Sequence, residues 1–377
     1  MKKVLFFLES LSGGGAEKVL TDIVRNLDPE RFDVTVCTVT DEGIYQSRVA
    51  EMVRYRSVLR EQDYRSGFMK RLLYRIRYKM IYTLPTAWVY RWLFRQKYDV
   101  ECAFIEGFAT KLIAASSNAK SRKIAWVHTD MERNPYAQNS FRNMDAHREA
   151  YRRYDAICCV SESVKEVFRK MILDDERVIV QYNPVDSDEV QRKGREEIDL
   201  IPNSKLQLGT IGRLTEQKGY IRLLDCLGKL RREYSDFSLW IVGEGAQRPD
   251  LEERIVRYSL ENHVRLLGFH ENPYKYMEKC DAFVCSSYAE GFSTAATEAL
   301  ILGKPVFTTE CAGMQELFGS EQCGEIVPNT DEALERMLRN LLSGIWKAED
   351  YADAVKRRGE AFDIKKRMAQ IEALLDQ

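Results

Sequence analysis

Short apolar runs alternate with amphipathic stretches along the chain, and this alternation constrains the fold more than any other feature. An apolar run at 3–8 precedes a glycine turn and a helical pattern at 16–27, and a second apolar run follows at 32–39. Further strands are expected at 99–105, 122–128, 156–160 and 177–182. Strands that alternate with helices in this way form parallel sheets with helices on both faces. The sequence therefore predicts an α/β protein.

The alternation stops near Asn183-Pro184 and then restarts, which indicates two domains. The segment 187–204 is polar, contains Pro202 and shows little periodicity, so it is interpreted as the interdomain linker. Strands of the second half are expected at 206–211, 237–242, 264–267, 281–285, 305–308 and 324–327. A chain of 377 residues is also long for one hydrophobic core. The expected domains are 1–186 and 205–347, followed by a charged helical tail at 348–377 whose apolar positions predict packing back onto the first domain.

Composition excludes several classes of protein. The apolar content of 45% and charged content of 31% are typical of a folded globular chain, and the net charge of -1 gives no reason to expect a nucleic-acid partner. The nine cysteines show no C-x-x-C spacing, which favours reduced thiols. Glu9 interrupts the first apolar run, so a signal peptide is not expected. These features predict a cytoplasmic protein.

A glycine-rich turn, Ser12-Gly13-Gly14-Gly15, joins the first strand to the first helix. Glycines let a ligand approach the backbone closely, and the free N–H groups of a helix N-terminus favour an anion such as phosphate. A dinucleotide fingerprint would need a glycine where Lys18 stands, so hydride transfer is not favoured. A tight strand-to-helix turn without a ligand remains the alternative.

Two cations follow the first strand of the second half, in Gly212-Arg213-Leu214-Thr215-Glu216-Gln217-Lys218-Gly219. The planar guanidinium of Arg213 and the point charge of Lys218 suit a diphosphate. Because both lie where a strand is expected to end, a ligand site is favoured over a solvated basic turn.

Two acids flank the start of another expected helix, in Glu290-Gly291-Phe292-Ser293-Thr294-Ala295-Ala296-Thr297-Glu298. Ser293 and Thr294 are suited to a helix N-terminus, which puts Glu290 in the loop and Glu298 about one turn inside the helix. Carboxylates beside unpaired N–H groups can hold sugar hydroxyls and phosphate. A capped helix with two surface acids is the alternative.

Together these segments resemble the retaining glycosyltransferases of family four, also called group-one glycosyltransferases, which have the GT-B fold. The most specific feature is the pair Glu290 and Glu298, with seven residues between them and Gly-Phe and Ala-Leu after the first and second acid. The resemblance implies two Rossmann-like domains that face each other across a cleft. The first would be on the acceptor side and the second would hold the donor nucleotide.

The resemblance also assigns roles to single residues. Arg213 and Lys218 match the pair that contacts the donor diphosphate. Glu298 matches the acid that binds the ribose, and Glu290 matches the acid that touches the donor sugar. The resemblance also implies that backbone groups approach the donor. Those of Phe292, Ser293 and Thr294 would face its sugar and phosphate, those of Leu267 and Phe269 would meet the base, and those of Gly14 and Gly15 would approach the phosphate.

His128, at the end of the run Ile124-Ala125-Trp126-Val127, matches the family's active-site histidine near the transferred sugar. A hydrogen-bonded structural histidine is the alternative reading. Glu106 and Asp130 are expected on the acceptor side without a specific role.

A metal site is not expected, although Asp186-Ser187-Asp188 spells the D-x-D pattern that another glycosyltransferase fold uses. It falls at the linker, far from the phosphate-binding segments, so we interpret it as a helix or turn cap. Cations from Arg213 and Lys218 would neutralise the diphosphate without a metal or another cofactor.

The resulting hypothesis is a retaining glycosyltransferase that moves a sugar from a nucleotide diphosphate sugar to a glycan or lipid-linked acceptor, in bacterial-type polysaccharide or glycoconjugate synthesis. Family frequency favours uridine diphosphate over guanosine diphosphate as the leaving group. We expect same-face substitution rather than a covalent intermediate on Glu290. A sugar-nucleotide epimerase of the same fold and a non-catalytic nucleotide-sugar-binding protein are the alternatives.

The segment 65–97 combines many basic and aromatic residues and contains no acid. A helix of this composition can lie in an anionic membrane interface, which would place the enzyme peripherally on the inner face of the cell membrane. The alternative is a helix pair, split at Pro85, whose apolar face packs inward.

Overall fold

The computed structural model describes residues 1–65, 67–198, 200, 202 and 204–377, which form two compact units. The first unit consists of Met1–Pro184 with Lys365–Gln377, and the second consists of Val185–Ile364. Residue 66 of the basic aromatic segment and residues 199, 201 and 203 of the expected linker lie outside the described residues.

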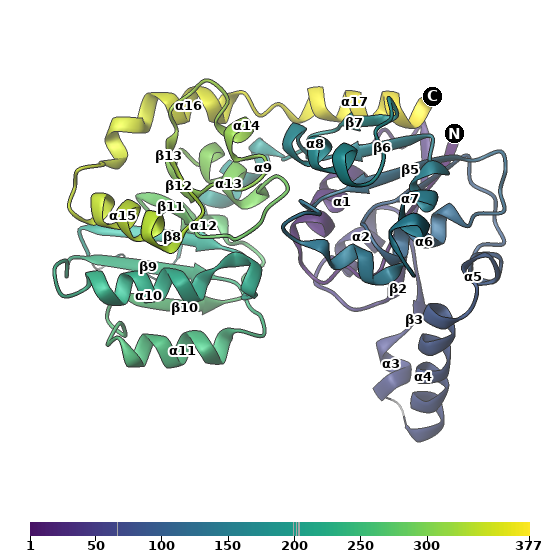
Figure 1. The fold of residues 1–377 in the computed structure, drawn as a ribbon, viewed down its shortest axis with the longest axis horizontal. Helices are drawn as coiled ribbons and strands as arrows, with labels where there is room; N and C mark the ends of the chain where they lie inside the picture. The colour runs from purple at the N-terminus through teal and green to yellow at the C-terminus, as the bar shows by residue number, and fades with distance from the viewer. Residues whose placement is uncertain (66, 199, 201, 203) are drawn as a thin grey trace. The chain divides into compact units, whose positions relative to one another are not determined.

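The first unit is built on a sheet of seven parallel strands in the order β3-β2-β1-β4-β5-β6-β7 (Figure 1). Its strands are β1 Lys2–Leu8, β2 Phe32–Thr40, β3 Arg54–Leu59, β4 Val100–Ala103, β5 Arg122–Val127, β6 Ala156–Cys159 and β7 Val178–Val180. Residues 4–8 of β1 are almost completely buried, as expected for a central strand covered on both faces. The sheet confirms the α/β class, and it adds β3, which the sequence analysis missed.

Helices connect these parallel strands, as crossover connections require. They are α1 Gly15–Asn26, α2 Gln46–Met52, α3 Glu61–Arg65, α4 Phe68–Thr83, α5 Thr86–Leu93, α6 Phe108–Ala114, the 3₁₀ segment η1 Pro135–Ser140, α7 Met144–Arg152 and α8 Glu162–Met171. Within this unit β1 and β4 are neighbours although β2 and β3 lie between them in the chain. The chain therefore reverses direction across the sheet at β1 and β4, and ligands of doubly wound sheets bind at such a point.

The second unit has a sheet of six parallel strands in the order β10-β9-β8-β11-β12-β13 (Figure 1). Its strands are β8 Leu206–Ile211, β9 Phe237–Val242, β10 Val264–Gly268, β11 Ala282–Cys285, β12 Val306–Thr309 and β13 Gly324–Val327. Its helices are α9 Ser187–Gly194, the 3₁₀ turn η2 Glu216–Lys218, α10 Tyr220–Leu230, α11 Arg248–Arg257, α12 Tyr274–Met277, α13 Thr294–Ile301, α14 Met314–Phe318, α15 Asp331–Leu342, the 3₁₀ turn η3 Ala348–Tyr351 and α16 Ala352–Glu360. In this sheet the order reverses between β8 and β11.

The segment expected to be a linker carries α9, and α9 belongs to the second unit. The side chain of Asp186 caps α9 by accepting a hydrogen bond from the Glu189 N–H at 2.9 Å. The helix is anchored because Val190 is buried and because Asn272 Nδ2 donates to the Lys193 carbonyl at 2.9 Å. Its eight residues are too few and too polar for a clear helical periodicity, which is why the sequence suggested a linker.

The tail 348–377 is not one helix but three segments divided between the units. Residues up to Ile364, including η3 and α16, belong to the second unit. The last helix, α17 Ile364–Asp376, packs on the first unit (Figure 1) with Ile371 and Leu375 fully buried. Its Glu372 accepts a hydrogen bond from the Asp28 N–H at 3.1 Å and pairs with Arg31. A helix at the end of the chain therefore completes the first unit.

The basic aromatic segment 65–97 begins at the last residue of α3 and forms α4 and α5, with Pro85 at the break between these two helices. In α4, Phe68, Leu72 and Ile76 are exposed, so the alternative interpretation, an apolar face that packs inward, does not hold for this helix. The helix is attached instead at its C-terminal end, where the Tyr82 hydroxyl donates to Glu9 at 2.7 Å. None of the helices in the described residues is both long and apolar enough to span a bilayer.

Candidate active site

The candidate site of the second unit lies where β8 and β11 end side by side. These two strands pair in parallel, so the segments that follow them leave the sheet at the same edge. The segment after β8 leads through η2 to Lys218, and the segment after β11 leads through Glu290 to α13. Two stretches about seventy residues apart in sequence are thereby brought together, as the sequence analysis requires for a diphosphate site.

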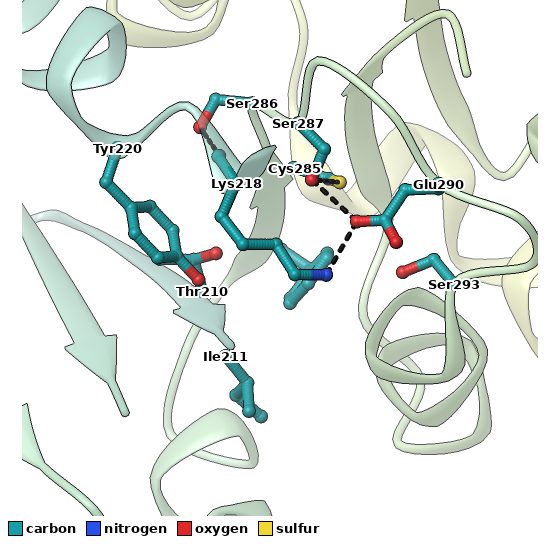
Figure 2. Close-up of a pocket in the computed structure, with 10 residues that line it drawn as sticks. Thr210, Ile211, Lys218, Tyr220, Cys285, Ser286, Ser287, Glu290 and Ser293 are labelled. Atoms are coloured by element: carbon teal, nitrogen blue, oxygen red, sulfur yellow. Dashed lines mark hydrogen bonds and ion pairs between the residues drawn. The ribbon is translucent and has the colours of Figure 1, made fainter. Parts of the chain in front are cut away.

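Lys218 and Glu290 form an ion pair at this edge, with Nζ 2.7 Å from Oε1 (Figure 2). The same carboxylate oxygen accepts a hydrogen bond from the Ser287 hydroxyl at 2.6 Å, and Glu290 is only 7% exposed. Burial alone would lower the pKa of Lys218, but Glu290, together with Cys285 and Tyr220, more than offsets this and holds that pKa above its usual value. Lys218 is therefore a fixed cation.

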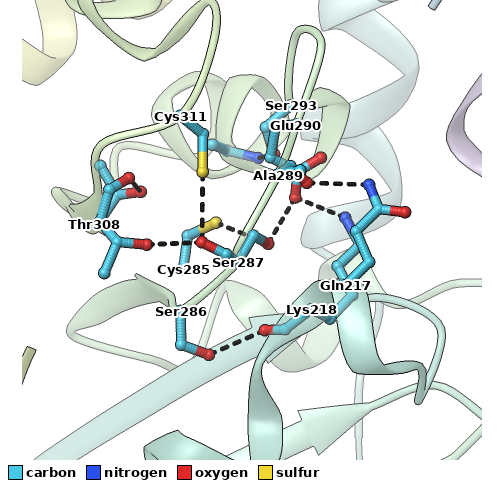
Figure 3. Close-up of polar contacts among 12 residues, drawn as sticks. Gln217, Lys218, Cys285, Ser286, Ser287, Ala289, Glu290, Ser293, Thr308 and Cys311 are labelled. Carbon is cyan, nitrogen blue, oxygen red and sulfur yellow. Dashed lines mark hydrogen bonds and ion pairs between the residues drawn. The ribbon is translucent and has the colours of Figure 1, made fainter. Parts of the chain in front are cut away.

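Backbone and side-chain hydrogen bonds hold the two segments in register (Figure 3). Gln217 Nε2 donates to the Ala289 carbonyl at 2.8 Å, and the Ser286 hydroxyl donates to the Lys218 carbonyl at 3.0 Å. Gly219 has a φ of +63°, and a Cβ there would stand 2.1 Å from the Ser286 carbonyl oxygen. A side chain at this position would force the segments apart, so the glycine is required by their close approach.

The N-terminus of α13 opens beside Glu290, and its first turn has the predicted cap. Ser293 is the N-cap, and its side chain accepts a hydrogen bond from the Ala296 N–H at 3.3 Å. Thr294 is the first helical residue, and Phe292 is buried just before it. The N–H groups of this turn carry the partial positive charge of a helix N-terminus, which favours a phosphate or another anion.

Glu298 lies one turn inside α13 and is buried, with 3% of its surface exposed. The Tyr274 hydroxyl donates to its Oε1 at 3.2 Å. The helix thus carries a carboxylate that is fixed by a tyrosine, as a residue that orients a ribose hydroxyl would need to be.

Six predicted donor residues of the second unit are not among those that line the pocket around Lys218 and Glu290: Arg213, Leu267, Phe269, Phe292, Thr294 and Glu298. Arg213 is exposed on the loop before η2, and its guanidinium bonds to none of the described residues. Leu267 lies in β10, the edge strand, and Phe269 follows that strand with 47% of its surface exposed. Ser293 does line the pocket, which is completed by Thr210, Ile211, Tyr220, Phe283, Cys285, Ser286 and Ser287.

Some of these pocket residues were missed by the sequence analysis. Tyr220 is 2% exposed and directly follows Gly219, and Ser287 is 1% exposed and lies three residues before Glu290. Burial raises the pKa of Tyr220 to about 12, so its phenol stays neutral beside Lys218. The adjacent hydroxyls in Cys285-Ser286-Ser287, directly after an apolar strand, were the signal available in the sequence.

The glycine turn of the first unit opens α1, with Gly14 as its N-cap and Gly15 as its first residue. A Cβ on Gly14 would stand 2.2 Å from Oε2 of Glu17, which folds back over the turn. The Glu17 carboxylate is the end of a flexible side chain, and Gly14 has a φ of -80°, so the contacts of the chain itself do not require a glycine at this position.

His128 directly follows β5, as predicted, and the centre of its ring lies 5.0 Å from that of the Phe104 ring, with the two rings tilted by 54°. Burial lowers its pKa, with Glu106 and a backbone hydrogen bond to Phe104 acting in the opposite direction. The Nε2 atom is buried and has no hydrogen-bond partner among the described residues. A neutral histidine with one unsatisfied nitrogen at a strand end can receive a ligand hydroxyl.

Glu106, completely buried, organises the loop that carries His128. One of its oxygens accepts hydrogen bonds from the N–H groups of His128 and Thr129 and from the Thr129 hydroxyl, at 2.7 to 2.8 Å. The other accepts from Tyr136 at 3.1 Å. Glu106 thus fixes the backbone at His128, a role that the sequence analysis did not assign.

Potential metal ligands do not gather at these sites. Within the ranges that the structure describes, no three His, Cys, Asp or Glu side chains are grouped so as to hold an ion. Asp186 of the D-x-D pattern caps α9, as interpreted from the sequence. All nine cysteines are buried free thiols.

Comparison with known proteins agrees with this arrangement. Residues 192–358 match the family model of glycosyl transferases group 1, and residues 13–189 match that of glycosyltransferase family 4. A relative in Campylobacter jejuni, N-acetylgalactosamine-N,N'-diacetylbacillosaminyl-diphospho-undecaprenol 4-alpha-N-acetylgalactosaminyltransferase, is 27% identical over 96% of both chains.

Solved structures share the fold over the full length. Anabaena HepE in complex with UDP-glucose matches with a TM-score of 0.77 at 22% identity, covering 100% of both chains. Sucrose-phosphate synthase from Thermosynechococcus elongatus matches with a TM-score of 0.75 at 15% identity, covering 100% of this chain and 99% of the other. With two Rossmann-like units, this is the GT-B fold. The two family models together account for nearly the whole sequence, and the chain belongs to the family 4, or group 1, glycosyltransferases.

Proposed function

We propose that this glycosyltransferase moves a sugar from a UDP-sugar to a lipid-linked or glycan acceptor, with retention of the anomeric configuration and without a metal ion, in polysaccharide or glycoconjugate synthesis. The observation that carries the proposal is the Lys218–Glu290 pair at the ends of β8 and β11, beside the N-terminus of α13.

These groups suit the two parts of a nucleotide diphosphate sugar. Lys218 and the first turn of α13 supply positive charge for the diphosphate. Arg213, which is exposed and lies five residues before Lys218 in the sequence, supplies a second side-chain cation. The second oxygen of Glu290 lies on the side of Ser293 in Figure 2 and is available to a sugar hydroxyl. Glu298 would hold the ribose, and the backbone at Leu267 and Phe269 would hold the base.

Retention is proposed to occur by same-face substitution. The bond between the anomeric carbon and the diphosphate oxygen breaks while the bond to the acceptor oxygen forms on the same face, and the acceptor proton passes to the departing diphosphate. Glu290 supports this over a covalent intermediate, because its Oε1 is already engaged by both Lys218 and Ser287. A carboxylate held in this way is a weak nucleophile.

A lipid-linked acceptor is supported by two observations. The name of the Campylobacter jejuni relative specifies an acceptor attached to diphospho-undecaprenol. In the first unit, His128 and Tyr136 flank Glu106 at the carboxyl ends of the strands, where a sugar acceptor would be bound.

A donor panel with product analysis tests the proposal. The protein is incubated with UDP-glucose, UDP-galactose, their N-acetyl forms and GDP-mannose, with and without an undecaprenyl-diphosphate sugar, in EDTA. We expect acceptor-dependent release of UDP and an α-linked product by NMR. A changed donor sugar without free UDP would identify an epimerase, and donor binding without any product would identify a non-catalytic protein.

The exposed face of α4 supports attachment to an anionic membrane. At about 100° per residue, its exposed apolar side chains fall within an arc of about 140° on one face of the helix. They are Phe68, Met69, Leu72, Leu73, Ile76 and Met80. Lys70 and Arg77 border this arc on one side, Arg71 and Arg75 border it on the other, and Lys79 lies within it near that second edge. An apolar stripe flanked by cations suits a helix lying in the plane of a membrane interface.

The opposite face of α4 holds the helix to the first unit. Tyr74, Tyr78 and Tyr82 line it, and the Tyr82 ring lies 4.5 Å from the Phe108 ring of α6. The apolar stripe is therefore presented outward from the first unit, and we propose that it inserts among lipid headgroups near the lipid-linked acceptor.

Vesicle sedimentation tests this attachment with a matched control. The triple variant Leu72→Gln, Leu73→Gln, Ile76→Gln should bind phosphatidylglycerol vesicles about tenfold or more weakly than the unchanged protein. Val256→Gln with Ile345→Gln changes exposed apolar residues of the second unit and should have no effect. The proposal would be overturned if the unchanged protein bound neutral-lipid vesicles at high salt as well as it binds phosphatidylglycerol vesicles. It would also be overturned if analytical ultracentrifugation showed that the stripe mediates dimers.

A further inference from the structure

The carbonyl oxygen of Ser287 is the meeting point of a buried polar network between β11 and Glu290. It accepts hydrogen bonds from Arg222 Nη2 and Thr309 Oγ1, each at 2.8 Å, and from Cys311 Sγ and Asn329 Nδ2, each at 3.2 Å. A carbonyl oxygen has two lone pairs, so four donors are an unusual concentration. The donors come from three segments of the second unit, namely α10, the end of β12 with the residues just after it, and the loop after β13, and they fix the backbone of one loop.

Arg222 is the most unusual of these donors because it is a cation with 3% of its surface exposed. Its Nε and Nη2 both donate to the Ser286 carbonyl, at 2.8 and 2.6 Å, and its guanidinium lies 3.8 Å from the centre of the Tyr288 ring. The nearest carboxylate is Asp331, which is 3.6 Å from Nη1 and largely exposed. Carbonyl dipoles and an aromatic face therefore provide most of the compensation for burying this charge.

The two residues whose carbonyls Arg222 holds are also the two residues that contact the Lys218–Glu290 pair. The Ser287 hydroxyl donates to Glu290 Oε1 at 2.6 Å, and the Ser286 hydroxyl donates to the Lys218 carbonyl at 3.0 Å (Figure 3). Each serine thus connects Arg222 through one peptide unit to one member of the pair. A shift of the Ser286-Ser287 backbone would displace both contacts together.

We propose that Arg222 is a positioning residue that fixes the Ser286-Ser287 backbone, so that the two serines hold Glu290 and Lys218 in the geometry the reaction needs. This rests on the proposed function, because the pair is the part of the donor site that Arg222 controls. Arg222 itself does not line the pocket. Its effect on turnover should therefore pass entirely through the loop.

The decisive experiment is a double-mutant cycle between Arg222→Met and Glu290→Gln, measured as kcat. Arg222→Met alone should lower kcat about 10- to 100-fold, the size of effect that a displacement of about 1 Å can produce. In the Glu290→Gln background the same change should cost less than about threefold, since the group being positioned has already lost its function. Additive losses would show that Arg222 does not act through Glu290 and would overturn the proposal.

Arg358→Met is the matched control for loss of packing and hydrogen bonds. Arg358 also donates to two backbone carbonyls, of Leu317 and Glu316, at 2.6 and 2.8 Å, and also lies over an aromatic ring, that of Phe362. It should lower stability without lowering kcat in the folded protein. If Arg222→Met does not fold, Arg222→Gln keeps a donor for one carbonyl without a buried charge, and it should give a smaller kcat loss with the same dependence on Glu290.

Hydrogen exchange distinguishes a failure of this proposal from a failure of the proposed function. Amides of residues 286–292 should exchange faster in Arg222→Met, or in Arg222→Gln if needed, than in Arg358→Met. If the unchanged protein turns over no nucleotide sugar but this loop loosens selectively, the catalytic proposal fails and the structural part stands. If turnover is normal and the loop exchanges equally in both variants, positioning by Arg222 is refuted.

Discussion

Replacing Lys218 with methionine should destabilise the second unit by about 2 to 4 kcal/mol, because it leaves a buried carboxylate without its cation. Methionine preserves most of the apolar stem, so the loss is mainly the 2.7 Å contact with Glu290. Breaking one side of a fully buried ion pair costs about 3 to 5 kcal/mol. The lower range applies here because Ser287 still donates to Glu290 and because the Lys218 side chain is 23% exposed.

The destabilisation should not change between about pH 6 and pH 9. Glu290 raises the pKa of Lys218 above its usual value of 10.5. A raised lysine pKa gives stability that is fully present below the pKa of the unfolded chain and is lost only as the pH rises through that of the folded state. Both lie above this window, so the unchanged protein retains the full contribution throughout.

Urea unfolding at several pH values, with fluorescence and circular dichroism as probes, measures this effect. Glu290→Gln and the double variant are unfolded in parallel. The loss in free energy of unfolding caused by Lys218→Met should be at least about 1 kcal/mol smaller in the Glu290→Gln background than in the unchanged protein, because no buried charge is then left unpaired. If the two single losses simply add, the ion pair contributes little to stability and the reasoning is wrong.

Three further changes examine other parts of the molecule. Arg213→Met should weaken UDP binding about 10- to 100-fold in calorimetry with little change in stability, since Arg213 is exposed; unchanged affinity would remove it from the site. Glu298→Gln should weaken binding of UDP more than binding of inorganic pyrophosphate, and equal losses would contradict a ribose contact. His147 is 1% exposed, and burial lowers its pKa to about 4. Below about pH 6.5 this histidine is protonated in the unfolded chain but stays neutral in the folded protein, so the free energy of unfolding should be about 2 kcal/mol lower at pH 5. In urea unfolding, His147→Phe should lose less stability between pH 7.5 and pH 5 than the unchanged protein. An equal loss would show that groups other than His147 cause the acid sensitivity.

Much of the fold follows from local patterns in the sequence. Residues 4–8 of β1 and 239–242 of β9 are buried, continuous apolar runs, and parallel sheets produce such runs wherever helices cover both faces. The edge strand β3 escaped because its sequence, Arg-Tyr-Arg-Ser-Val-Leu, carries charges on its exposed positions. Edge strands of this kind lack the apolar signal on which the prediction depended.

The candidate site was predictable where chemistry and chain order coincide. Lys218 and Glu290 each follow a strand, and the topology makes those strands neighbours, so the two charges meet. Arg222 was not predictable because it lies in an amphipathic helix, where an arginine ordinarily faces solvent. Its burial depends on carbonyls from a loop more than sixty residues away in sequence, which no local pattern reports.

The place of α17 has a consequence for how the protein is made. The first unit needs residues from both ends of the chain, and the 180 residues of the second unit must be translated between them. At about 5 to 20 residues per second, the ribosome leaves the unit incomplete for about 10 to 40 seconds. During that interval the surface that Ile371 and Leu375 later cover is bare, and it is open to chaperones. A premature stop before residue 365 would release a chain whose second unit is whole but whose first unit never closes.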